Sequence, residues 1–160
     1  MAIDRKPLNE AAGRFERDVL RHIPLAAAMR IRVADATDSQ LTLAAPLAPN
    51  LNHEGIAFGG AIECLGTLAC WGLLWLALDT ADTMIVIQRG ETEFIAPITD
   101  ELRAEARFPD TETWKRFADQ FARHGRSRIE LAATIGSTTQ TGAARFQGRF
   151  VATRKTQTTA

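Results

Sequence analysis

The first part of the chain changes from a helical to a strand-like spacing of apolar residues. Residues 8–23 repeat apolar side chains at helical spacing, with charged residues on the other faces, which predicts an amphipathic helix. Pro24 then marks either a break or the start of a new helix. Residues 30–36 and 40–46 alternate apolar and polar positions around Thr-Asp-Ser, a sequence typical of turns, so they predict a β-hairpin.

The most apolar segment follows a loop rich in Pro, Asn and Gly and ends near Asp79. It is uncharged from Cys64 to Leu78, and its apolar residues cannot all share one helix face, so the helix must be enclosed on several sides. A membrane span needs about 20 predominantly apolar residues. Glu63 and the preceding glycine pair shorten the apolar run, and no Lys or Arg flanks it. A buried core helix is therefore favoured over a membrane span.

The second half of the chain is mostly strand-like. Residues 84–98 contain two strand-like pieces, and residues 102–108, 126–136 and 143–154 each predict one strand. Residues 113–123 carry aromatic side chains at helical spacing and predict a short helix. Alternating strands suit an antiparallel sheet with one face covered. We therefore expect an α+β fold, in which a curved antiparallel sheet wraps around the apolar helix.

Composition narrows the function classes. The 160 residues suggest a single domain, 1–160, and 19 Lys and Arg balance 19 Asp and Glu, which argues against a nucleic-acid partner. Two cysteines give no disulfide framework, and the three histidines share no ligand spacing, so no metal site is expected. The N-terminus has no apolar run typical of a signal peptide, so we expect a cytoplasmic protein without a membrane partner.

Three stretches resemble the hotdog-fold thioesterases, and most of all the thioesterase domain of the YiiD C-terminal type. They are HIPLAAAMRIRV, LTLAAPLAPNLNHEGIAFGGAIECLGTLACWGLL and ETEFIAPITDELRAEARF. The resemblance covers about residues 23–152, within an expected core of about 23–154. It implies a hotdog fold and hydrolysis of acyl-CoA or acyl carrier protein thioesters, with coenzyme A present only as part of the substrate. It also implies a homodimer; whether dimers pair into tetramers stays open.

Gly59 and Gly60 open the apolar helix and are candidates for polarising the thioester carbonyl. Backbone N–H groups at a helix start have no intrahelical partner and lie at the positive end of the helix dipole. Such groups can stabilise a developing oxyanion, and glycines let the substrate oxygen approach the backbone closely. The alternative is that the two glycines only permit close packing.

Resemblance to thioesterases of the phenylacetate-pathway type implies further site residues. Asn52 lies at the Asn position of that motif, with a turn-capping role as the alternative. Phe58 replaces the motif's His, and the position of the catalytic Asp falls on Thr67. Glu63 lies one turn before Thr67 and is the only charge in the apolar helix, where an unpaired carboxylate is costly. We hypothesise that Glu63 acts as the base and that Thr67 orients the water. The alternative for Glu63 is a first-turn acid that points to solvent.

Substrate-binding residues are also expected. Phe58 is interpreted as a wall of the acyl groove, and Phe94 belongs to a Phe-Ile-Ala-Pro segment that resembles the aromatic strand of hotdog thioesterases. Arg126 and Arg128 are candidates for the phosphates of coenzyme A, because the guanidinium fork suits phosphate, with ordinary surface charge as the alternative.

Three functions compete on this evidence. A thioester hydrolase is favoured by the resemblance and by the residues that open the apolar helix. A non-catalytic acyl-thioester binder is favoured by the replacement of His and Asp by Phe58 and Thr67. A hotdog hydratase or dehydratase ranks last, because it needs an active-site His where Phe58 stands.

Overall fold

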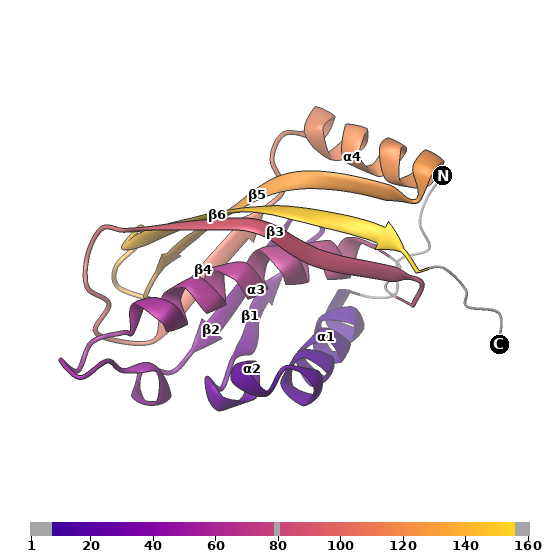
Figure 1. Ribbon diagram of the computed structural model, residues 1–160. Helices are drawn as coiled ribbons and strands as arrows, with labels where there is room; N and C mark the ends of the chain where they lie inside the picture. Colours follow the sequence, from indigo (N-terminus) through magenta and orange to yellow (C-terminus); the bar gives the residue numbers. More distant parts are fainter. Residues whose placement is uncertain (1–7, 79–80, 156–160) are drawn as a thin grey trace.

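A curved antiparallel sheet and the helices packed against it make up the computed structural model, which describes residues 8–78 and 81–155 (Figure 1). The strand order is β1-β2-β4-β5-β6-β3, and every pairing is antiparallel. The elements are α1 (Leu8–His22), α2 (Pro24–Ala28), β1 (Arg32–Ala36), β2 (Gln40–Ala45), the 3₁₀ turn η1 (Ala48–Asn50), α3 (Gly59–Ala77), β3 (Thr83–Phe94), β4 (Leu102–Arg107), α4 (Thr111–His124), β5 (Arg126–Gly136) and β6 (Ala144–Arg154).

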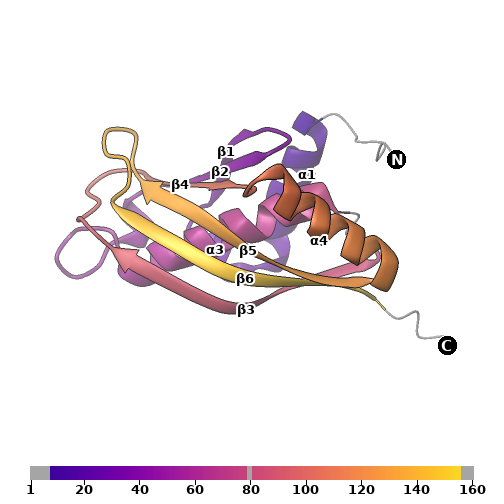
Figure 2. The ribbon, with the colours of Figure 1, turned by 90° about the horizontal axis from the view of Figure 1, so that it is seen from above.

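The helices pack against different parts of the sheet. α3 packs on the inner face against five strands, and α1 packs against α3 and β1. α4 runs alongside β5, and its Phe117 is buried in the same core cluster as Ile129 and Leu131 of that strand (Figure 2). The alternate residues of β5, on the outer face, stay exposed. The expected α+β arrangement, including the amphipathic N-terminal helix, is therefore confirmed. Pro24 starts a new short helix, α2, which settles the alternative left open by the sequence.

β3 is the element in which the structure differs most from the sequence-based expectation. It is one continuous strand of 12 residues, where the sequence suggested two pieces. A register shift between Ile87 and Arg89 explains the difference, because the extra residue there moves the inward-facing positions from odd to even numbers. Ile85 faces inward before the shift, and Gly90 lies against the core ring of Phe146 after it. The strand ends at Phe94, three residues before Pro97.

α3 is the core of the molecule. Eleven of its 19 residues are buried, which confirms the interpretation of this segment as a core helix. By length and composition alone it also passes the test for a membrane span, but most of it is buried inside the protein. The other side of the helix is partly exposed, and we call it the open face of α3. It consists of Gly60, Glu63, Thr67, Trp71 and Trp75.

Two glycines allow the sheet and α1 to approach α3 closely. A Cβ on Gly66 would lie 2.8 Å from Cβ of Phe146 and 2.9 Å from Cδ1 of Ile135. A Cβ on Gly72 would lie 2.5 Å from Cζ of Phe15 in α1. Real Cβ atoms do not approach other heavy atoms so closely, so each contact requires a residue without a side chain.

Replacing Gly66 by Ala is expected to destabilise the protein. Overpacking a core costs about 1–3 kcal/mol, whereas Ala gains only about 1 kcal/mol over Gly in a helix interior. We therefore expect the free energy of unfolding, measured by urea denaturation, to fall by a net amount of up to about 2 kcal/mol. The matched control is Gly13→Ala in α1, whose Cβ would meet only the guanidinium of Arg17 at 3.5 Å and should raise stability. A Gly66→Ala protein stabilised as much as Gly13→Ala would contradict the close packing at this position.

Candidate active site

The loop before α3 is held in place by Asn50, a residue that the sequence analysis did not single out. Its side chain is 3% exposed, and its Nδ2 donates to the carbonyl oxygens of Met29 at 3.0 Å and Pro46 at 2.8 Å. Its own carbonyl oxygen accepts from the N–H of Phe58 at 2.8 Å. Asn50 therefore ties the start of α3 to the segment that leads into β1. Nothing in the local sequence distinguishes it from Asn52, because its partners are carbonyl groups brought near only by the fold.

Asn52 has the turn-capping role that was the alternative interpretation. Its Oδ1 accepts from the N–H groups of Glu54 at 2.9 Å and Ile56 at 3.2 Å, which closes an Asx turn. The backbone of the same turn is closed by hydrogen bonds between Asn52 and both Ile56 and Gly55. The side-chain oxygen is thus engaged within the loop, which leaves only the amide NH₂ group to meet a ligand.

The first turn of α3 presents two unpaired backbone donors. Phe58 is the N-cap, and its carbonyl oxygen accepts from the N–H groups of Ala61 at 2.9 Å and Ile62 at 3.1 Å. Within residues 8–78 and 81–155, the N–H groups of Gly59 and Gly60 have no hydrogen-bond partner. These two donors lie at the positive end of a 19-residue helix, where a negative charge is favoured.

Aromatic rings pack over both glycines. A Cβ on Gly59 would lie 3.4 Å from the ring of Phe94, and one on Gly60 would lie 2.4 Å from the ring of Phe58. Gly60 therefore permits a close approach of the Phe58 ring, whereas Gly59 is in ordinary contact with Phe94. Close packing does not exclude the other interpretation, because the N–H groups of both glycines remain unpaired. Both rings are more than half exposed. With two further exposed side chains they form an apolar mouth, which consists of Leu51, Phe58, Phe94 and Ile95.

Glu63 lies on the open face of α3, about 6 Å along the helix axis from Gly59, given a rise of 1.5 Å per residue. Thr67 follows one turn later and is partly buried. The structure corrects two expectations for Glu63. It occupies the second turn of α3 rather than the first. Its side chain is also exposed in the single chain, so an isolated chain does not pay the free-energy cost of burying an unpaired carboxylate. Among the described residues, Glu63 has no hydrogen bond or ion pair.

The two cysteines of α3 are not nucleophiles in this environment. Burial raises the pKa of the Cys64 thiol, and it raises the pKa of the more deeply buried Cys70 thiol well above its usual range. Both thiols are therefore protonated at neutral pH and pack as small hydrophobic side chains. Within the described part of the chain, no group of three or more His, Cys, Asp or Glu side chains could hold a metal ion.

Arg126 and Arg128 do not lie beside the glycine pair of the same chain. They are at the start of β5, where Arg126 pairs across the sheet with Thr153 and, through it, with Met84 at the beginning of β3. Phe94, which contacts Gly59, pairs at the opposite end of the sheet. Nine residue steps of β-strand separate these two ends, a distance of about 30 Å at 3.3 Å per residue. The two arginines also face outward, whereas α3 lies on the inner face.

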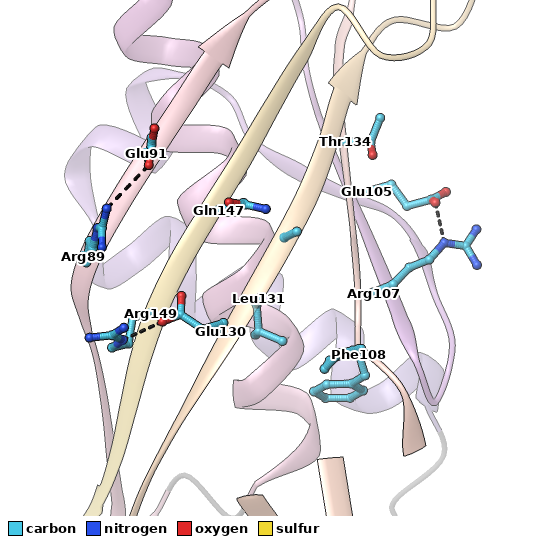
Figure 3. A pocket seen from close by; sticks show the side chains of 12 residues that line it. Arg89, Glu91, Glu105, Arg107, Phe108, Glu130, Leu131, Thr134, Gln147 and Arg149 are labelled. Carbon is cyan, nitrogen blue, oxygen red and sulfur yellow. Dashed lines mark hydrogen bonds and ion pairs between the residues drawn. The ribbon is translucent and has the colours of Figure 1, made fainter. Parts of the chain in front are cut away.

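A hollow of about 690 Å³ on the outer face of the sheet is lined largely by paired charges (Figure 3). Nε of Arg107 lies 2.7 Å from Glu105, Nε of Arg149 lies 2.6 Å from Glu130, and Arg89 lies 3.7 Å from Glu91. These pairs are exposed and screened by water, so each contributes little to stability. Because each of these guanidinium groups already has a carboxylate partner, the hollow offers no concentrated charge to a ligand.

Comparison with solved structures shows relatives over nearly the whole chain. The protein OLEI01261 of unknown function from Chlorobaculum tepidum is 27% identical, with a TM-score of 0.85 over 92% of this chain and 96% of its own. A protein from Shewanella oneidensis, described as a "putative thioesterase", is 28% identical, with a TM-score of 0.80 over 91% of this chain and 99% of its own. PA5026 of Pseudomonas aeruginosa shares the fold at 20% identity, with a TM-score of 0.76 and coverages of 94% and 97%.

The fold is that of the hotdog thioesterases, with the central helix enclosed by the curved sheet. A family model matches residues 13–154, and its description reads "Putative thioesterase (yiiD_Cterm)". The match spans α3, the apolar mouth and all six strands. The chain therefore belongs to the YiiD C-terminal thioesterase family.

Proposed function

We propose that this protein hydrolyses acyl thioesters of coenzyme A or of an acyl carrier protein at the N-terminus of α3. The observation that carries the proposal is the pair of unpartnered N–H groups on Gly59 and Gly60, directly beside the apolar mouth. The donors suit the oxygen of a thioester carbonyl, and the apolar mouth suits the acyl chain attached to it. Membership of a thioesterase family supports the same assignment.

The proposed reaction uses one carboxylate. Glu63 accepts a proton from a water molecule as the water oxygen attacks the carbonyl carbon, and Thr67, one turn later, orients that water. The N–H groups of Gly59 and Gly60 donate to the oxyanion of the tetrahedral intermediate. The carbon–sulfur bond then breaks, the proton passes from Glu63 to the departing thiolate, and a carboxylic acid and a free thiol are released.

We infer that two copies pair through β3. It is an edge strand of 12 residues, with Met84, Val86 and Ile87 each at least 42% exposed. A long, apolar edge of this kind is a template for pairing with another chain. The opposite edge, β1, has only five residues and a bulge, and the N–H of Val33 is covered by the carboxylate of Glu16 at 2.7 Å.

A non-catalytic acyl-thioester binder is the second candidate function. It is favoured by Phe58 and Thr67, which stand where thioesterases of the phenylacetate-pathway type carry His and Asp, and by the exposure of Glu63 in the single chain. The two candidates use the same donors and the same apolar mouth. They differ in whether Glu63 activates water, so a substitution at that residue separates them.

Glu63→Gln is expected to lower kcat at least about 100-fold, because general bases contribute roughly 10²–10⁴-fold to catalysis. Thiol release would be followed over a panel of acyl-CoA and acyl carrier protein substrates. The matched control is Glu54→Gln, since Glu54 is an exposed acid in the preceding loop whose carboxylate, among the residues that the structure describes, pairs only with the exposed His53. Unchanged turnover in Glu63→Gln would refute the role of Glu63. Absence of turnover in the parent protein, together with thermal stabilisation by acyl-CoA, would favour the binder.

Ile87→Lys is expected to convert the dimer into a monomer and to lower activity in parallel. Ile87 faces inward but is exposed at the free edge of the sheet, so a single chain is expected to tolerate lysine there. Between two paired copies, the lysine would be buried without a partner charge, which is costly. Sedimentation velocity would report a halved mass. Ala132→Lys, exposed on the outer face in the middle of the sheet, is the control and should leave both mass and activity unchanged. A parent protein that sediments as a monomer would contradict the inference.

A further inference from the structure

One line of residues on α3 runs along the inner side of β3. Its members are four residues apart and so follow one another along the helix: Gly59, Glu63, Thr67 and Trp71. Both ends of this line meet β3. A Cβ on Gly59 would lie 3.4 Å from the ring of Phe94, and Nε1 of Trp71 donates to the carbonyl oxygen of Ile85 at 3.0 Å. The middle of the line therefore lies beside the stretch of β3 between Ile85 and Phe94.

Thr92 is the inward-facing residue of β3 at the level of Glu63. It pairs with Phe146, which is buried in the core, and directly opposite residues of an antiparallel pair share one face of the sheet. Phe94, two positions later, lies over Gly59. Two strand residues cover about 6.6 Å and four helix residues about 6 Å. The step from Phe94 back to Thr92 therefore matches the step from Gly59 to Glu63.

The hydroxyl of Thr92 is buried and has no hydrogen-bond partner. Its Oγ1 makes no hydrogen bond within residues 8–78 and 81–155. Thr92 is also the one residue from Val86 to Phe94 that is not exposed. A buried hydroxyl without a partner costs free energy, because it has given up its hydrogen bonds to water. Such a hydroxyl needs a partner that the side chains of one chain do not supply in this conformation.

Two other buried oxygen atoms without a partner differ from that of Thr92. They belong to Asn50 and Asp100, and each of these side chains is held through its second polar atom. Nδ2 of Asn50 donates to two carbonyl oxygens, and Oδ2 of Asp100 accepts from the hydroxyl of Thr139 at 3.0 Å. Thr92 has only one polar side-chain atom. Its hydroxyl therefore contributes no hydrogen bond to the fold.

The carboxylate of Glu63 lacks a donor in the complementary way. Among the described residues it has no hydrogen bond or ion pair, and in the single chain it is exposed to water. An acyl thioester in the apolar mouth would displace water from this part of the open face of α3. A carboxylate that loses water needs another donor, because an unsolvated charge is costly. Thr92 is the side chain of β3 that can supply one, since the next inward residue, Gly90, has no side chain.

We propose that Thr92 is a positioning residue, whose hydroxyl donates a hydrogen bond to the carboxylate of Glu63 when a thioester is bound. The proposal rests on the hydrolysis proposed above. The hydrogen bond holds one oxygen of the carboxylate and leaves the other to accept the proton of the attacking water. Thr92 touches neither the substrate nor the water, so it affects the reaction only through Glu63.

Thr92→Val removes the hydroxyl and keeps the shape of the side chain. With the acyl-CoA that the parent protein hydrolyses fastest, we expect kcat to fall at least about tenfold while KM stays unchanged. A tenfold loss corresponds to about 1.4 kcal/mol, and hydrogen bonds to charged groups contribute at least this much. Thr92→Ser keeps the hydroxyl and should retain most of the parent kcat. The matched control is Thr134→Val, on the exposed outer face of β5, which should change neither constant.

The outcomes separate this proposal from the proposed function. Unchanged kcat in Thr92→Val, with a large loss in Glu63→Gln, would overturn the role of Thr92 and leave the proposed hydrolysis intact. Equal losses in Thr92→Val and Thr92→Ser would also overturn it, because the hydroxyl would then not be the group that matters. A parent protein without turnover on any acyl thioester would overturn both proposals.

Thermal unfolding distinguishes a positioning role from a structural one. Valine at position 92 removes a buried hydroxyl without a partner and suits a β-strand, so Thr92→Val should have a higher Tm than the parent protein even though it is less active. A hydroxyl that supports the fold would give the opposite result, a lower Tm together with lower activity. That result would overturn the proposal.

The double variant Thr92→Val/Glu63→Gln shows whether Thr92 acts through Glu63. Once the carboxylate is absent, loss of the hydroxyl should lower kcat no further, because residues that act as a unit are strongly non-additive. The double variant should therefore have the kcat of Glu63→Gln alone. Losses that multiply in the double variant would overturn the proposal by giving Thr92 a role independent of Glu63.

Discussion

The structure depends on the need to enclose α3. This helix carries one charge in 19 residues and has no polar face, so it is stable in water only when other elements cover it. A single six-stranded sheet achieves this by curving around the helix, with Gly66 and Gly72 allowing the sheet and α1 to come close. The sheet nevertheless covers one side of a cylinder and α1 only part of the rest, which leaves the open face of α3 partly exposed. The candidate active site begins on that remaining face.

Much of the fold could be predicted from sequence because several strands pair one buried face with one exposed face. β4 and β5 show that alternation residue by residue, and their bounds match the expectation closely. β3 was harder, because the bulge near Gln88 breaks the alternation and an edge strand buries little of either face. The start of α3 at the glycine pair was also predictable, since residues without side chains directly precede an apolar helical run.

The candidate site was predictable only in part, because its decisive contacts join residues distant in sequence. Phe94 lies over Gly59 although 35 residues separate them, and Asn50 holds the carbonyl of Met29 across 21 residues. The capping role of Asn52 is local and was among the alternatives read from the sequence. Exposure was the property that sequence predicted least well. Glu63 was expected to be costly because its neighbours in the chain are apolar, yet its side chain points away from the enclosed side of the helix.

Exposure of Glu63 in one chain links its proposed chemistry to assembly. In contact with bulk water, a carboxylate interacts weakly with a distant dipole or charge, because the high dielectric constant screens it. The open face of α3 lies next to the free edge of the sheet, because Gly59 contacts Phe94 and Trp71 donates to the carbonyl of Ile85, both in β3. Pairing of two copies through β3 would therefore bring a second subunit over the open face of α3. Exclusion of water there strengthens the interaction of the Gly59 and Gly60 donors with an oxyanion. Under the proposed pairing, the same apolar edge would drive association and supply the dry environment that the proposed hydrolysis at α3 requires.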